Sequence, residues 1–286
     1  DGVRYRTRVF TELDSAKNIL YGSNQQQAGN TKQLFMDVYW PKNDTFSQRP
    51  VVVLAHGGSF LVGERGEIKG LCYEFASRGF TAVTIDYRLF NDFSQNIDSV
   101  MIYDVVTEAV SDMKAAVRKV REDAHNSNPY GVDTNLIFIG GVSAGAITAD
   151  HYAYLDSTDN LNFTLDSVIQ SNGGFEGNTS SNDQFSTEVK GVLNYSGALR
   201  HDYWIQADNV PLFSVHEDQD PVVPYGKQIT TSLGTPIEVS GSGALHLVAE
   251  EVGIMNRLIT IENSNGHVKY FLDGPNTEIY GLVIDS

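Results

Sequence analysis

The chain has little cysteine and no long apolar run. Cys72 is the one cysteine among 286 residues, which excludes an internal disulfide and a cysteine-rich metal site. Its neighbours, Leu71-Cys72-Tyr73-Glu74-Phe75, are typical of a helix with one apolar face, so we expect a buried, unreactive thiol. The longest apolar run, Val51 to Ala55, has strand length. Because a membrane-spanning helix needs about 18 apolar residues or more, we expect no integral membrane contact.

Basic residues are scarce as well. Lysine and arginine number 20 against 36 acidic residues, which gives a formal charge of −16. Such a surface repels phosphate backbones, so a nucleic-acid partner is not expected. The chain starts with Asp1 and not with Met. This start fits a secreted or periplasmic protein that has lost a signal peptide, and equally a trimmed cytoplasmic one.

What the sequence does contain is a regular alternation of strand-like and helix-like segments. We expect strands at residues 34–40, 51–55, 80–85, 136–139, 190–195, 210–215 and 257–261, and helices at 71–77, 100–124, 144–155 and 244–252. This alternation predicts an α/β fold with a mostly parallel sheet covered by helices on both faces. Apolar residues make up 41% of the chain, enough for the core of a single domain over residues 1–286.

Residues 157–188 interrupt the pattern. They are rich in Asn, Ser, Thr and Gly and have no strong hydrophobic period. We interpret them as a loop-rich insertion, a candidate lid over the site. They lack the amphipathic helix with which interfacial lipases expose an apolar surface.

One five-residue motif carries nucleophile chemistry. Gly141-Val142-Ser143-Ala144-Gly145 follows the apolar run 136–139 and precedes a predicted helix. A serine lifted on such a strand-to-helix turn needs neighbours without bulk, and the helix N-terminus favours developing negative charge. The context therefore predicts Ser143 as a nucleophile.

A serine nucleophile needs a histidine and an orienting acid, each on a loop at a strand end. His267 follows the predicted strand 257–261 and stands after a glycine. Three carboxylates compete for the role of the acid after strand 210–215, namely Glu217, Asp218 and Asp220. The remaining histidines have weaker context, although His216 can pack beside the acid loop; the others are His125, His151, His201 and His246. We interpret the His216-Glu217-Asp218 cluster as ordinary surface and expect no metal.

A second glycine-containing loop, His56-Gly57-Gly58-Ser59, follows the buried run 51–55. Glycines allow backbone N–H groups to approach a substrate oxygen closely. With the serine motif downstream, we interpret this loop as the site of an oxyanion hole.

Together these motifs resemble esterases and lipases of the α/β-hydrolase superfamily, in the hormone-sensitive-lipase-like and carboxylesterase-type branches. The resemblance extends from about residue 34 to 272. It includes His56 to Phe60, Asp86-Tyr87-Arg88-Leu89, the Ser143 motif, and the run from His216 to Pro224.

The resemblance implies a role for each site residue. It selects Asp220 as the acid, because Asp220 stands where the family's aspartate precedes X-X-Val-Pro. Pro221 also biases Asp220 to an extended backbone, which suits a stiffly held carboxylate. It further implies that the N–H groups of Gly58, Ser59 and Ala144 hold the oxyanion. No cofactor is required for this chemistry.

The predicted function is hydrolysis of small, short-acyl-chain esters by a Ser143–His267–Asp220 triad through an acyl-enzyme. Three alternatives stay open: an esterase that removes acetyl or feruloyl groups from polysaccharides or cleaves polyesters, a peptidase, and a non-catalytic binding protein. The last is disfavoured because such proteins typically lose a triad member, and this chain keeps all three.

Overall fold

A computed structural model describes residues 3–94, 96–232 and 234–272. Asp1, on which the expectation of a removed signal peptide rests, lies outside the described residues. Eight strands form the main sheet in the order β1-β2-β4-β3-β5-β6-β8-β11. They are β1 (Leu13–Gln25), β2 (Thr31–Pro41), β3 (Arg49–Ala55), β4 (Thr81–Ile85), β5 (Val132–Val142), β6 (Val192–Tyr195), β8 (Leu212–Glu217) and β11 (Asn256–Ile261). β2 runs antiparallel to β1 and β4, and the remaining pairs are parallel. The predicted α/β class with a mostly parallel sheet is confirmed.

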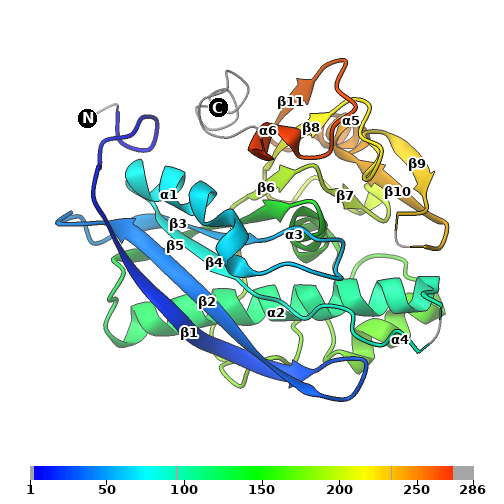
Figure 1. Cartoon of the computed structure of the whole chain (residues 1–286), viewed down its shortest axis with the longest axis horizontal. Coiled ribbons are helices and arrows are strands. Elements are labelled where there is room, and N and C mark those ends of the chain that lie inside the picture. The colour runs from blue at the N-terminus through cyan, green and yellow to red at the C-terminus, as the bar shows by residue number, and fades with distance from the viewer. Residues whose placement is uncertain (1–2, 95, 233, 273–286) are drawn as a thin grey trace.

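Helices cover both faces of this sheet (Figure 1). In chain order the helical segments are η1 (Arg65–Ile68), α1 (Lys69–Ser77), α2 (Ser99–Asn126), α3 (Ala144–Tyr154), α4 (Phe163–Ser171), η2 (Asp202–Trp204), α5 (Ser242–Val252) and α6 (Lys269–Leu272). α2 starts at the cap residue Asp98, whose side chain accepts a hydrogen bond from the Met101 N–H at 2.9 Å. Among the described residues, no helix is both long and apolar enough to cross a membrane.

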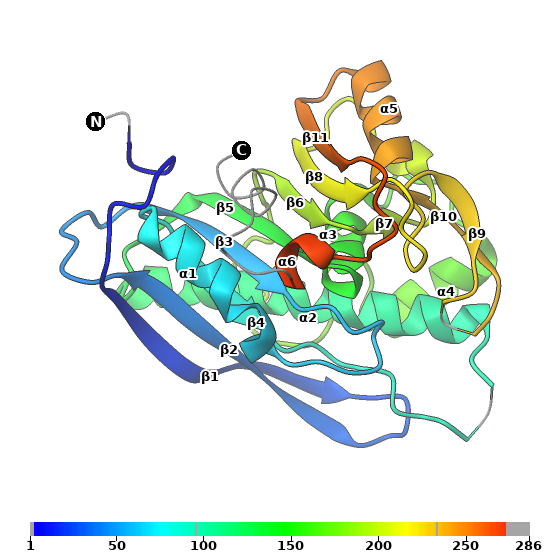
Figure 2. The same ribbon diagram turned by 45° about the horizontal axis from the view of Figure 1, so that its top comes forward.

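The buried strand β3 divides the core into two layers because its side chains alternate between the faces of the sheet. Val51 and Val53 belong to the cluster that packs against α2 and α3. Val52 and Leu54 belong to the other, which includes Cys72 of α1 and Tyr270 of α6. Figures 1 and 2 agree that α1 and α6 lie on one face, with α2 and α3 on the other. The Cys72 thiol is fully buried, as predicted, and burial raises its pKa.

A second, three-stranded sheet was not predicted. It has the order β7-β10-β9 and contains β7 (Ala198–Leu199), β9 (Lys227–Thr230) and β10 (Ile237–Gly241). β7 has two residues, and β9 is almost wholly exposed. Neither therefore carries the apolar run or clean alternation that marks a strand in a sequence.

The segment 157–188 differs from its prediction because it contains a helix. α4 buries Leu165, Val168 and Ile169, and Asn162 caps its first turn by accepting from the Leu165 N–H at 2.9 Å. The expectation of a segment without an amphipathic helix was therefore wrong. α4 packs against α2, so its apolar side faces the interior.

The parallel part of the sheet determines where the loops meet. β5, β6, β8 and β11 are neighbours and run in the same direction. The segments that follow their carboxyl ends therefore gather along one edge, which is where α/β sheets bind ligands. Ser143 follows β5, Asp220 follows β8, and His267 follows β11.

Candidate active site

Ser143 occupies a strained turn between β5 and α3. Its backbone has φ 54° and ψ −117°, a region that residues with a side chain rarely adopt. The turn is closed by neighbours without side chains: a Cβ on Gly145 would lie 2.1 Å from the Ala55 carbonyl oxygen, and one on Gly141 would lie 2.6 Å from it. The Ser143 N–H donates to the Tyr195 carbonyl at 2.8 Å. The two glycines are thus required by the close packing of β5 and α3 on β3.

His267 lies between the serine and the acid. Its Nδ1 is 2.6 Å from Asp220 Oδ2, and its Nε2 is 2.8 Å from Ser143 Oγ. Because an ionised carboxylate only accepts hydrogen bonds, Nδ1 carries the proton and Nε2 is left to accept from the serine hydroxyl. The structure thus brings together the three side chains that the sequence analysis selected.

Asp220 is held as an ionised carboxylate. Its Oδ1 accepts from the N–H groups of Val222 and Val223 at 2.8 and 3.0 Å. Burial raises its pKa, but hydrogen bonds from His216, His267 and the backbone outweigh burial and lower it to about 2. His216 Nε2 lies 3.0 Å from the Val223 carbonyl, which can only accept, so this ring nitrogen is a donor.

The two competing carboxylates fix the loop that carries His267. Asp218 accepts from the N–H groups of Asn263 and Ser264 at 2.9 and 3.0 Å, on the side before the histidine. Glu217 accepts from the Lys269 N–H at 2.8 Å, on the side after the histidine. In the sequence both were alternatives to Asp220 as the acid of the triad. In the structure they hold the backbone of the loop that carries His267. Glu217 and His216 are fully buried, so the expectation that the His216-Glu217-Asp218 cluster is ordinary surface was wrong.

The loop after β3 lies directly against the serine turn. A Cβ on Gly57 would be 3.4 Å from the Ser143 Cβ. Gly58 has φ 109°, and a Cβ there would lie 2.0 Å from the Val62 carbonyl oxygen, so glycine is required. Ser59 and Ala144 line the same pocket as Ser143, and Ser59 also has a positive φ of 55°.

The run Asp86-Tyr87-Arg88 supports this loop from the end of β4. Tyr87 stacks on the His56 ring at 4.4 Å between centroids and donates to the His56 carbonyl at 2.9 Å. Arg88 is buried against Asp112 of α2, with 2.9 Å between Nη2 and Oδ1. His56 is itself buried, and burial lowers its pKa. It is therefore a structural member of the loop.

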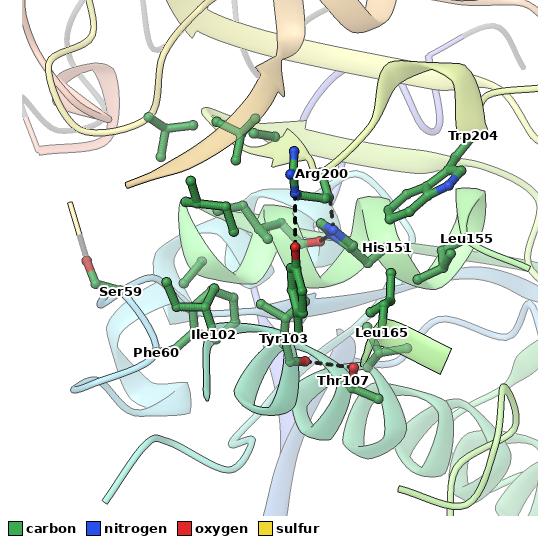
Figure 3. Close-up of a pocket in the computed structure, with 18 of the residues that line it drawn as sticks. Ser59, Phe60, Ile102, Tyr103, Thr107, His151, Leu155, Leu165, Arg200 and Trp204 are labelled. Carbon is green, nitrogen blue, oxygen red and sulfur yellow. Dashed lines mark hydrogen bonds between the residues drawn. The ribbon is translucent and has the colours of Figure 1, made fainter. Parts of the chain in front are cut away.

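An apolar pocket opens beside Ser143 (Figure 3). One wall comes from Phe60 and from α2, and another from α4 and the segment after it. The rest comes from the small sheet and from the Val222–Pro224 turn of the acid loop. The side chains include Ile102, Val106, Val110, Ile147, Leu155, Leu165, Ile169, Phe175, Trp204, Val222, Val223, Ile237 and Val239.

The same pocket contains polar residues that the sequence did not mark as functional. His151 of α3 donates from Nδ1 to the Ile147 carbonyl at 2.8 Å, and its Nε2 accepts from the Arg200 N–H at 3.3 Å. Burial lowers its pKa to about 4, so the ring is neutral near pH 7. Arg200 and Tyr103 also line the pocket. A helical histidine and an arginine beyond a two-residue strand carry no motif, which is why the sequence gave no signal.

The strand order, the serine turn and the loops that meet beside it define an α/β-hydrolase. The chain belongs to the BD-FAE family, whose model matches residues 36–200. It is 30% identical over 162 residues to Esterase E4 of Myzus persicae, across 55% of this chain and 28% of that protein. It is 28% identical over 137 residues to isoprenylcysteine alpha-carbonyl methylesterase ICME of Arabidopsis thaliana, across 48% of this chain and 27% of that protein. The match thus covers less than a third of either relative's length.

Solved structures extend the likeness over nearly the whole chain. Thermogutta terrifontis esterase 2 phosphorylated by paraoxon matches with a TM-score of 0.67 and 19% identity, over 95% of this chain and 90% of that one. Its propionate-bound form matches with a TM-score of 0.65 and 19% identity, over 94% and 91%. At this identity the likeness establishes the fold.

Proposed function

We propose that this protein is a serine carboxylic ester hydrolase that acts through Ser143, His267 and Asp220. The observation that carries the proposal is the continuous hydrogen-bonded chain from Asp220 through His267 to Ser143. This series of hydrogen bonds ends at Ser143, which lines the apolar pocket. The esterase names of the relatives and of the solved structures with this fold support the reaction class.

The geometry is suited to two-step acyl transfer. Ser143 Oγ attacks the ester carbonyl while His267 Nε2 takes its proton. N–H groups of Gly58, Ser59 and Ala144 receive the oxyanion. The tetrahedral intermediate then expels the alcohol, which leaves with the proton from His267. Water, deprotonated by the same nitrogen, releases the acid and restores the serine.

Asp220 keeps His267 in the productive tautomer. The Nδ1 proton is directed at Asp220 Oδ2 at 2.6 Å, so Nε2 faces the serine as a base. With a pKa lowered to about 2, Asp220 stays ionised wherever an esterase works and stabilises the imidazolium formed in each step.

The substrates that we propose are small esters with short acyl groups. Leu165, Val168 and Ile169 of α4 are buried, and Leu165 and Ile169 line the pocket, whereas Phe163 at the start of the helix is exposed. One exposed phenylalanine is not the continuous apolar helix face with which interfacial lipases bind an emulsion. Thermogutta terrifontis esterase 2 has been solved with propionate and with butyrate bound, which is in keeping with short acyl groups for this fold.

The test is a series of soluble esters from acetate to hexanoate, assayed with the wild type and Ser143→Ala. The wild type should hydrolyse the series, and the variant should lose about 10⁴-fold or more in kcat, because only the oxyanion hole and binding remain. Circular dichroism would verify that the variant is folded. A folded variant with a tenth of the wild-type rate would place the nucleophile elsewhere.

Chain-length dependence is measured in the same assay. Emulsified long-chain triglycerides should be poor substrates. A rate that rises steeply once the substrate passes its solubility limit would contradict the proposed substrate class.

A further inference from the structure

The pocket beside Ser143 is apolar but contains two cationic side chains, Lys114 and Arg200. A cation against apolar walls is costly unless something compensates its charge. Each lies about 4 Å from one carboxylate, Glu176 for Lys114 and Glu238 for Arg200, and the two differ in how far the protein uses their hydrogen-bond donors.

The ammonium group of Lys114 has its partners within the protein. Its Nζ donates to the Phe175 carbonyl and lies 4.0 Å from Glu176 Oε1. It also faces the Tyr152 ring at 5.1 Å from the centroid. Lys114 therefore ties α2 to the segment after α4.

The protein uses only some of the hydrogen-bond donors of the Arg200 guanidinium. Its Nη1 donates to the Glu238 carbonyl at 2.7 Å and lies 3.9 Å from the half-exposed Glu238 carboxylate, and its Nε reaches the Tyr103 hydroxyl at 3.5 Å. Within the described ranges, no hydrogen bond or ion pair of Nη2 is found, and the side chain is 21% exposed. One edge of the guanidinium is thus left to bind something else.

The position of Arg200 is fixed rather than adaptable. Its backbone N–H donates to His151 Nε2, the residue directly follows β7, which pairs with β10, and its guanidinium is held by the Glu238 carbonyl. Figure 3 shows the guanidinium lying over the Tyr103 hydroxyl, inside the group of pocket side chains and between Ser59 and Trp204 in that view. A donor held this way loses little entropy when it binds a ligand.

The Tyr103 hydroxyl is a further donor in the pocket. The Tyr103 hydroxyl accepts from Arg200, which leaves its own proton free to donate. The Trp204 ring also lines the pocket, but its Nε1–H is buried and is not counted as a donor to a ligand. The donors of Arg200 and Tyr103 in an apolar pocket indicate a ligand group with acceptor oxygens.

We propose that Arg200, assisted by Tyr103, binds a carboxylate at the end of the substrate remote from the ester bond. This proposal rests on the proposed ester hydrolysis and names its substrate class, monoesters of short dicarboxylic acids. A guanidinium edge matches a carboxylate in shape and charge, and apolar walls strengthen the pair relative to water. The net charge of −16 disfavours anions at long range, so an internal cation is needed to select one.

The test compares matched substrates. Monoethyl esters of the dicarboxylic acids with about four to eight carbons are assayed against the ethyl esters of the monocarboxylic acids of equal length. For at least one length, the wild type should show the higher kcat/KM on the carboxylate-ended ester. Arg200→Met, which keeps the aliphatic stem, should lower that value by about ten- to a hundred-fold, as loss of hydrogen bonds to a charged group predicts.

The controls separate recognition from general charge and from folding. For Arg200→Met the measured quantity is the ratio of kcat/KM on the carboxylate-ended ester to kcat/KM on the neutral ester of equal length, and this ratio should fall about tenfold or more, because only the first substrate makes a charged contact. Lys227→Met removes an exposed cation of β9 that pairs with Asp202 and does not line the pocket; it should leave the preference intact. Arg200→Lys should restore part of the preference, because it keeps the charge without the fork.

Binding without turnover distinguishes the two proposals. The chain has two tryptophans, so a Trp40→Phe, Ser143→Ala protein reports on Trp204 alone by fluorescence. Monoethyl adipate should perturb this signal at lower concentration than ethyl hexanoate, and Arg200→Met should abolish the difference. Hydrolysis of neutral esters with no carboxylate preference at any length would overturn the role of Arg200 alone. Absence of all ester turnover together with Arg200-dependent binding would overturn the proposed function and leave the carboxylate site standing.

Discussion

At the scale of single residues, three carboxylates within four positions have three different tasks. Asp220 contacts His267, whereas Glu217 and Asp218 bind backbone N–H groups on either side of it. In the sequence all three are acids at a strand end. What separates them is the path of the loop from β11 to α6, which a single sequence does not specify.

The acids are distinguished by paired substitutions. Asp220→Asn should lower kcat by about 10⁴-fold near neutral pH, because the amide favours the wrong His267 tautomer. Asp218→Asn keeps an acceptor oxygen for Asn263 or Ser264 and should cost less than about tenfold. Both variants would be assayed on one soluble ester, with circular dichroism as the check on folding. The reverse order would transfer the acid role to Asp218.

The polar residues of the pocket could not be identified from the sequence. Ser143 and His267 follow recognisable strands and glycines, so chain order and spacing selected them. Arg200 follows the short strand β7, whereas Tyr103 and His151 lie on α2 and α3, and the fold brings the three together. Their contacts depend on how the β7-β10-β9 sheet packs over α2 and α3, and no local pattern encodes that packing.

At the scale of elements, the serine turn depends on close approach of β3, β5 and α3. Gly145→Ala would place its Cβ 2.1 Å from the Ala55 carbonyl oxygen, where the strand backbone cannot yield. It should destabilise the protein by about 2 kcal/mol or more and greatly reduce ester hydrolysis, because the turn itself must move.

Gly70→Ala is the matched control. Gly70 lies in α1 with nothing within 4 Å of its would-be Cβ, so alanine should be neutral or stabilise by up to about 1 kcal/mol. Thermal unfolding and ester assays on both variants should show a loss of stability and activity in Gly145→Ala and none in Gly70→Ala. Equal behaviour of the two would refute the packing argument.

The predicted elements were those with strong periodicity. β3 and β5 carry buried apolar runs, and α2 carries a long apolar stripe, so their existence followed from the sequence. α4 did not, because its nine residues span fewer than three turns within a polar segment. Its usable signal was the capping Asn162 followed by Leu165, Val168 and Ile169 at helical spacing. The missed strands β7 and β9 gain their stability from pairing with β10.

At the scale of the whole molecule, buried histidines couple stability to pH. Burial lowers the pKa of His151 to about 4, and burial also lowers the pKa of His56 and His246. The ordinary histidine pKa is about 6.5, so between these values the unfolded chain takes up a proton that folded His151 refuses. The contribution of His151 to the free energy of unfolding should therefore be lost as the pH falls from about 6.5 to 4, whereas the carboxyls of Glu108 and Asp150, whose pKa values are raised by burial, act in the opposite direction.

This dependence is measurable by denaturant unfolding at a series of pH values. His151 should account for a loss of about 2 to 3 kcal/mol across the window. His151→Gln cannot take up the proton, so its curve should lack this loss relative to the wild type, whereas the curve of His125→Gln, at the exposed end of α2, should follow the wild type. An unaltered slope in His151→Gln would show that the ring is not held neutral.

The central claim, that Ser143 is the nucleophile, is tested most directly by covalent labelling. The native protein would be treated with a fluorophosphonate probe, digested, and examined by mass spectrometry, with Ser143→Ala treated in parallel. We expect one adduct, on the peptide that contains Ser143, and none in the variant, because only a serine activated by His267 attacks the probe rapidly. An adduct on another residue, or a wild-type protein that hydrolyses esters yet stays unlabelled at Ser143, would contradict the account.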